Sequence, residues 1–337
     1  MLYCTTNNDS VTFDSRCPLV QNYTDSGEIF VPVQLPEFTS KEILALQEKS
    51  FGQNIADILN LFFDTELTGW DIDFCIGRST ARTAQINNKL FSIELWHNPA
   101  DSFSYLEHRL YKAVSKVAEN AQPTEWFRIC IRIATLFASL GELFHRYSPA
   151  SNVTVDLSLP GNDLAMPLAA IYSRQMGLPI GALIITTEEN KSLWNLVHHG
   201  SIYLSQRSAD TAVSVERLIH RTLGCADAVE FKKTYDQGKV YHIDEEILPM
   251  LNSGIFCVVT SKERTIQTIN SVYKTNQYVI DPVSAMCVGG LQDYRARRGE
   301  HNPTVVFSEQ SPLLHLDCIQ SATGLTMRAL NERFNKL

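Results

Sequence analysis

The sequence predicts an α/β fold built on a mainly parallel sheet. Its central segment has the periodicity of a strand, a turn, a helix and a second strand, over residues 152–160, 161–163, 164–179 and 182–187. This succession within roughly 35 residues is typical of a βαβ unit, whose two strands are parallel. In open sheets of this kind, ligands bind at the carboxyl ends of the strands, so the turn at 161–163 is a candidate site.

The rest of the chain extends this pattern. Apolar residues at helical spacing predict helices over 40–49, 53–63, 104–119, 125–147, 212–223, 227–236, 244–252, 263–275 and 282–292. Short apolar runs predict strands near 29–31, 89–97, 254–260 and 304–308. Thr124 is a suitable N-cap for the helix that begins at 125, and Asp281-Pro282 has the usual pattern of a helix N-terminus.

Composition excludes several classes of protein. The 337 residues are 44 % hydrophobic and 20 % charged, which predicts a packed core in about two domains or one large one. A net charge of −8 disfavours nucleic-acid binding, which needs clustered cations. We expect no membrane span and no signal peptide. With eight cysteines and no C-x-x-C pair or metal-ligand spacing, the sequence predicts a soluble cytoplasmic protein without a metal site.

The turn at Gly161-Asn162-Asp163 leaves two alternatives open. A glycine-bearing turn before a helix can cradle a phosphate, because free N–H groups and the helix dipole both favour an anion. Only one glycine is present, however, and Asp163 would repel an anion. The other interpretation is an ordinary βα turn in which Asp163 caps the helix.

Several stretches resemble, in chain order, the motifs of threonine synthases. GNDLAMPLAAIYSRQMGLPIGALIITTEENKSL, which starts at Gly161, resembles the family's segment with PTGNFG followed by AKKMGLPI. MLYCTTNN and SGEIFVPVQLPEF resemble the family's opening. AVSVERLIHRTLG, QYVIDPVSAMCVGG and PTVVFSEQSP resemble three later motifs, so the resemblance extends from residue 1 to about 325.

Threonine synthases are fold-type II pyridoxal-phosphate enzymes that turn O-phosphohomoserine into threonine. The resemblance therefore implies a twisted, mainly parallel sheet flanked by helices. LWHNPADSFSY (95–105) is similar to the family's LFHGPTLAFKD, whose lysine forms the Schiff base with the cofactor. His97, Pro99 and Phe103 keep their places, but Ser104 stands at the lysine. A serine cannot form that imine.

Other positions matched to functional residues also differ. The phosphate loop keeps Gly161 and Asn162 but continues with Asp163, and Glu309 stands where the family has the threonine beside the pyridine nitrogen. We take these residues, with Ser104, as the candidate ligand-binding positions. Further departures occur at Asn7, Tyr105, Ser214, Val283 and Ser311.

The interval between the lysine turn and the phosphate loop is short. The family has a small substrate-binding domain there, whereas this chain has residues 105–160, which are mostly of helical pattern. The resemblance thus implies a threonine-synthase-like N-terminal segment, 1–85, and a large α/β domain, 86–337. The small domain would be largely deleted and reduced to a short helical connection around 105–150.

These departures predict a protein that has lost the family's chemistry. We expect a pseudoenzyme, or a retooled protein that binds a small metabolite or a protein partner, with no cofactor. Whether it is an enzyme of another kind stays open. One alternative is a lyase of the threonine synthase type that binds pyridoxal phosphate and acts on a small phosphorylated amino acid. Another is a structural partner of a different enzyme, with self-association into a homo-oligomer as a further option.

Overall fold

The fold is centred on one six-stranded sheet. The computed structural model describes residues 1–77, 80–117, 121–147, 154–188, 191–299 and 302–334. The strand order is β10-β7-β6-β11-β5-β4. The strands are β4 (Arg82–Asn87), β5 (Leu90–Glu94), β6 (Val155–Pro160), β7 (Ile180–Glu188), β10 (Ile255–Thr260) and β11 (Thr304–Ser308). All neighbours are parallel except β4, which runs antiparallel to β5, so the predicted fold class is confirmed.

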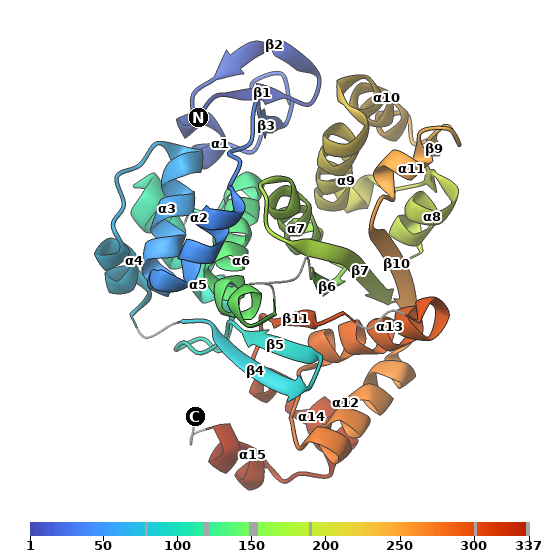
Figure 1. Ribbon diagram of the computed structural model, residues 1–337. Helices are drawn as coiled ribbons and strands as arrows, with labels where there is room; N and C mark the ends of the chain where they lie inside the picture. Colours follow the sequence, from blue (N-terminus) through green and yellow to red (C-terminus); the bar gives the residue numbers. More distant parts are fainter. Residues whose placement is uncertain (78–79, 118–120, 148–153, 189–190, 300–301, 335–337) are drawn as a thin grey trace.

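Helices cover both faces of this sheet (Figure 1). Before β6 lie α1 (Arg16–Val20), α2 (Ser40–Ala45), α3 (Phe51–Phe63), α4 (Gly69–Ile76), α5 (Phe103–Ser115) and α6 (Glu125–Tyr147). After it come α7 (Ala165–Gln175), α8 (Ser192–His199), α9 (Ala209–Leu223), α10 (Cys225–Asp236), α11 (Leu248–Leu251), α12 (Lys262–Asn276), α13 (Pro282–Arg298), α14 (Leu316–Thr323) and α15 (Met327–Phe334).

Two smaller sheets complete the secondary structure. One consists of β2 (Asn8–Phe13), β1 (Tyr3–Thr5) and β3 (Phe30–Pro32), and the other of β8 (Ser201–Ile202) and β9 (Tyr241–His242). No helix among the described residues is long and apolar enough to cross a bilayer.

Alternating side chains divide the core into two layers. On β7, Leu183 and Ile185 join the larger cluster, with α3, α6 and α7, whereas Ile184 joins the smaller one, with α12 and α13. This follows from the twofold period of a strand, which turns successive side chains to opposite faces. Gly290 allows α13 to approach β7 closely, because a Cβ there would lie 2.1 Å from Thr186 Oγ1.

The local predictions that rest on capping and on the βαβ pattern are confirmed. β6, α7 and β7 form the expected unit; residues 152–153 of the predicted strand lie outside the described residues. Thr124 Oγ1 accepts from the Phe127 N–H at 3.1 Å at the start of α6. Asp281 accepts from the N–H groups of Val283 and Ser284, both at 3.0 Å, at the start of α13.

Several helices differ from the sequence-based expectation, and α1, α8, α14 and α15 have no counterpart among the predicted helices. The segment predicted as a helix over 244–252 shortens to the single turn of α11. By contrast, α4 was not expected. It begins with a capping box between Thr68 and Asp71 and buries Ile72 and Ile76, but it exposes Trp70 and Phe74, so its apolar residues are spread around the helix and do not form a single stripe.

Trp126 joins the N-terminal segment to the centre of the molecule. Its indole N–H donates to Tyr3 Oη at 3.1 Å, and its ring makes edge-on contacts with Tyr3, Phe62 and Tyr172. The Arg217 guanidinium lies over the same ring, 5.0 Å from its centroid. The N-terminal segment therefore shares one apolar core with α6 and α7.

The variant Trp126→Ala should lose about 3–5 kcal/mol of unfolding free energy, because it empties the centre of this core and removes the hydrogen bond that the Tyr3 hydroxyl accepts. Urea denaturation measures the change. Trp70→Ala is the matched control; its ring is 71 % exposed, so we expect a change within about 0.5 kcal/mol. Equal losses for the two variants would contradict the packing described.

Candidate functional site

Three loops meet at the carboxyl edge of the sheet. They follow β5, β6 and β11, which are neighbours in the sheet. Backbone hydrogen bonds join two of them: the Phe103 N–H donates to the Glu309 carbonyl at 2.7 Å, and the Ser311 N–H donates to the Asp101 carbonyl at 2.9 Å. The sheet topology thus brings Ser104 and Glu309, 205 positions apart (309 − 104), to the same edge.

Ser104 lies in the first turn of α5 and is exposed. Its hydroxyl is 2.9 Å from the Ser102 hydroxyl, and Ser102 also caps the helix. His108 is nearby, but its Nδ1 is bonded to the Ser104 carbonyl oxygen and its Nε2 to Gln122. Among the described residues no base contacts the Ser104 hydroxyl, so the arrangement lacks the activation that a nucleophilic serine requires.

A buried arginine on α6 dominates the edge. Arg132 donates to both oxygens of Glu309, at 3.2 and 2.9 Å, and forms an ion pair with Glu107 of α5. Its guanidinium also lies 5.0 Å from the centroid of the Phe103 ring. Both Arg132 and Glu107 are almost fully buried, so each depends on the other for compensation of its charge.

Arg128, one turn before Arg132, extends these contacts to the loop after β6. It forms an ion pair with Asp163, and its Nε lies 3.8 Å from Glu107. We call Asp163, Arg128, Glu107, Arg132 and Glu309 the edge network. It contains three carboxylates and two guanidinium groups, and therefore has an excess of negative charge.

The pKa shifts in the edge network follow from burial and from neighbouring charges. Burial raises the pKa of Glu309; Arg132 opposes this effect and the Glu107 carboxylate adds to it. Burial would also raise the pKa of Asp163, but Arg132 and Arg128 lower it overall. Burial alone would lower the pKa of Arg132, yet Glu107 and Glu309 raise it.

The loop after β6 is tightly packed. A Cβ on Gly161 would lie 2.5 Å from the Thr187 methyl group, so only glycine fits there. Asp163 Oδ1 accepts from the Ala165 N–H at 2.9 Å, close to the cap interaction expected for it. Asp163 therefore already occupies the start of α7, where a phosphate would otherwise find free N–H groups.

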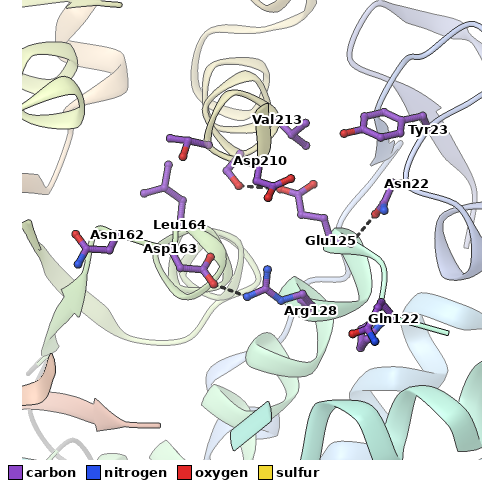
Figure 2. A pocket seen from close by; sticks show the side chains of 13 residues that line it. Asn22, Tyr23, Gln122, Glu125, Arg128, Asn162, Asp163, Leu164, Asp210 and Val213 are labelled. Carbon is purple, nitrogen blue, oxygen red and sulfur yellow. Dashed lines mark hydrogen bonds and ion pairs between the residues drawn. The ribbon is translucent and has the colours of Figure 1, made fainter. Parts of the chain in front are cut away.

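A cavity of about 570 Å³ opens beside this loop (Figure 2). It lies between the N-terminal ends of α6, α7 and α9 and is lined by Asn162, Asp163, Arg128, Glu125, Asp210 and Tyr23, among others. Glu125 is held by Arg217 at 2.8 Å and by the Ser214 hydroxyl at 2.9 Å. The volume and the convergent polar groups suit a small ligand.

A smaller cavity of about 310 Å³ shares Tyr23 and Val213 with the first. Its lining includes Glu216 of α9, whose Oε1 accepts from the Thr6 hydroxyl. Glu216 is 2 % exposed, and burial raises its pKa to about 7.

Sequence reasoning found part of this site. Asn162 and Asp163 line the larger cavity, Glu309 belongs to the edge network, and Ser104 stands outside both. Arg132 was visible only as a charge in the apolar stretch 129–140, a placement that indicates a buried partner without naming it. Glu107, Glu125 and Asp210 had no sequence signal.

Comparison with known sequences finds distant relatives of the chain. No family profile matches it. Threonine synthase from Pseudomonas aeruginosa is 26 % identical over 231 residues, which cover 65 % of this chain and 47 % of that protein. Threonine synthase-like 1 from Macaca fascicularis is 22 % identical over 183 residues, 50 % of this chain but only 24 % of that protein. The matched region thus spans less than half of each relative.

Solved structures agree on the fold. The structure of threonine synthase from Brucella melitensis superposes with a TM-score of 0.82 at 18 % identity, covering 96 % of this chain and 92 % of that one. The yeast enzyme superposes with a TM-score of 0.80 at 17 % identity, covering 98 % and 91 %. The chain is related to threonine synthase.

The Brucella threonine synthase was solved with pyridoxal phosphate bound. The edge network of the chain described here does not fit that group. Asp163 places a carboxylate at the start of α7, where the resemblance expects the phosphate. Glu309, assigned to the pyridine-nitrogen position, is engaged through both oxygens by Arg132. Ser104, which the resemblance places at the lysine position, has no amine. No step of a reaction is therefore derived through this cofactor.

In this threonine synthase relative, the variant Arg132→Met should lose about 3–5 kcal/mol of unfolding free energy, because the buried Glu107 would lose its close countercharge and keep only Arg128, whose Nε is 3.8 Å away. Chemical denaturation measures the loss. Arg128→Met, on the same helix but 35 % exposed, should cost at most about 1 kcal/mol. A loss for Arg132→Met as small as that for Arg128→Met would be incompatible with a buried network.

Glu216 predicts a pH dependence of stability. Its folded pKa of about 7 exceeds the ordinary 4.5, so its contribution is complete below 4.5 and disappears as pH rises through about 7. The charged groups around it are Lys232, Arg217 and Asp236. Glu216→Gln should remove this loss, which is on the order of 3 kcal/mol across that window.

Denaturant titrations at a series of pH values test this expectation. Glu230→Gln, which changes an exposed carboxylate on the next helix, should follow the wild type. A Glu216→Gln variant that loses stability with rising pH as steeply as the wild type would show that Glu216 titrates normally.

Proposed function

We propose that this threonine synthase relative performs no Schiff-base chemistry and acts by binding a small ligand in the cleft between α6, α7 and α9. The edge network is the observation that supports this proposal. Its ion pairs connect Asp163 to Glu309, the two positions that the resemblance assigns to the cofactor's phosphate and pyridine nitrogen. A retained threonine synthase site would need a phosphate cradle at the first of these positions and a lysine at position 104.

The cleft supports the second half of the proposal. The larger cavity has the size of a small-molecule site, and its polar side chains come from three different helices and from the loop at Tyr23. The protein is in this view a pseudoenzyme with respect to the threonine synthase reaction and a retooled binding protein. Its eight cysteines are all free thiols, which fits a reducing compartment, and we place it in the cytoplasm.

Addition of pyridoxal phosphate tests the loss of Schiff-base chemistry. The wild-type protein should develop no saturable imine absorption, because no amine of a described residue takes part in the edge network. After borohydride reduction and peptide mapping, we expect label only at low, scattered levels on exposed lysines such as Lys112. Ser104→Lys should behave in the same way, since Arg132 still engages Glu309 in that variant.

A stoichiometric imine traced to one lysine of the wild type would contradict the proposal. Saturable, stoichiometric labelling of Ser104→Lys alone would show that the cofactor pocket is intact and that only the lysine is missing. That result would remove the role given to the edge network.

A further inference from the structure

Two cavities adjoin beside α9, and we call them together the two-part cavity. They share Tyr23 and Val213, and their volumes are about 570 and 310 Å³. Tyr23 is 43 % exposed, so its ring is open to a ligand on the surface that the cavities share. A ligand that reaches from one part to the other would therefore pass along this ring.

The larger part has one carboxylate that no described residue neutralises. Glu125 is paired with Arg217, and Asp163 with Arg128. Asp210, the second residue of α9, is exposed at the cavity and has no hydrogen-bond or ion-pair partner among the described residues. It lies beside Glu125 in Figure 2. An unpaired carboxylate at this point attracts a cation and repels an anion.

The smaller part contains a buried acid. Glu216 is 2 % exposed; Thr6 donates to one carboxylate oxygen, and no described residue donates to the other. The rest of this lining is largely apolar or aromatic, with Ala212, Val213 and Tyr235. Lys232 also lines it, but both oxygens of Asp236 hold its ammonium group, at 2.7 and 2.5 Å.

Tyr23 shares the lining of the two cavities with the carboxylates of Glu125, Asp210 and Glu216. Burial raises the pKa of Tyr23, these three carboxylates raise it further, and Arg217 lowers it. An aromatic ring surrounded by carboxylates is the environment that recognises an organic ammonium ion, because ring faces and carboxylates both attract a cation. The aliphatic walls at Ala212 and Val213 suit the carbon chain of such a ligand.

We propose that the two-part cavity binds a small aliphatic amine as its ammonium ion, between Asp210 and Glu216 and against the ring of Tyr23. This inference rests on the proposed ligand-binding function and names its ligand class. The same charges exclude phosphorylated and other anionic ligands from the cavity. A linear diamine matches the arrangement best, since Asp210 lines the larger part and Glu216 the smaller one.

Isothermal titration with putrescine tests this site. The wild-type protein should bind it saturably, and both Asp210→Asn and Glu216→Gln should weaken binding by about tenfold or more, the cost of one charge-assisted contact. Asp317→Asn is the matched control, because Asp317 is likewise an exposed second residue of a helix, α14, away from the cavity. Its affinity should equal that of the wild type.

Inorganic phosphate and propylamine complete the titration. Phosphate should not bind, and propylamine should bind more weakly than putrescine. No binding of either amine, or binding that Asp210→Asn and Asp317→Asn weaken equally, would overturn the ammonium site. Binding of phosphate that Asn162→Ala abolishes would also overturn it, while leaving the ligand-binding function in place. A different result, imine formation with pyridoxal phosphate, would contradict the proposed function itself.

Discussion

The guanidinium group of Arg132 holds the carboxyl edge of the sheet together. It joins α6 to α5 through Glu107 and to the loop after β11 through Glu309. A buried charge of this kind is stable only when its partners are placed accurately, because the cost of removing it from water exceeds the gain from a poorly aligned pair. The position of the three loops and the shape of the adjoining cleft therefore depend on this residue.

The charges that close the edge also determine what the cleft can accept. Arg128 links the buried pair to Asp163, so the loop after β6 presents a carboxylate where a phosphate cradle would need free N–H groups. Asp210 and Glu216 add negative charge on the side of α9. In the proposed account, Asp163 opposes the binding of an anion, and Asp210 and Glu216 provide the affinity for an organic cation.

The sequence predicts features that depend on neighbours along the chain. Alternation over 152–187 predicts the βαβ unit, and Thr124 and Asp281 predict two helix starts from a few residues each. The edge network could not be predicted in this way, because Arg132 and Glu309 are 177 positions apart and meet only through the placement of β11 beside β5 and β6. The resemblance to threonine synthase located Ser104, Asp163 and Glu309, but it gave no indication of the ion pairs that connect Asp163 to Glu309.

The most direct test of the account is a crystal structure of the protein grown or soaked with pyridoxal phosphate. The account predicts that Arg132 still bridges Glu107 and Glu309, with no cofactor density between Asp163 and Glu309. Pyridoxal phosphate ordered between those two residues, with Arg132 displaced from Glu309, would contradict it.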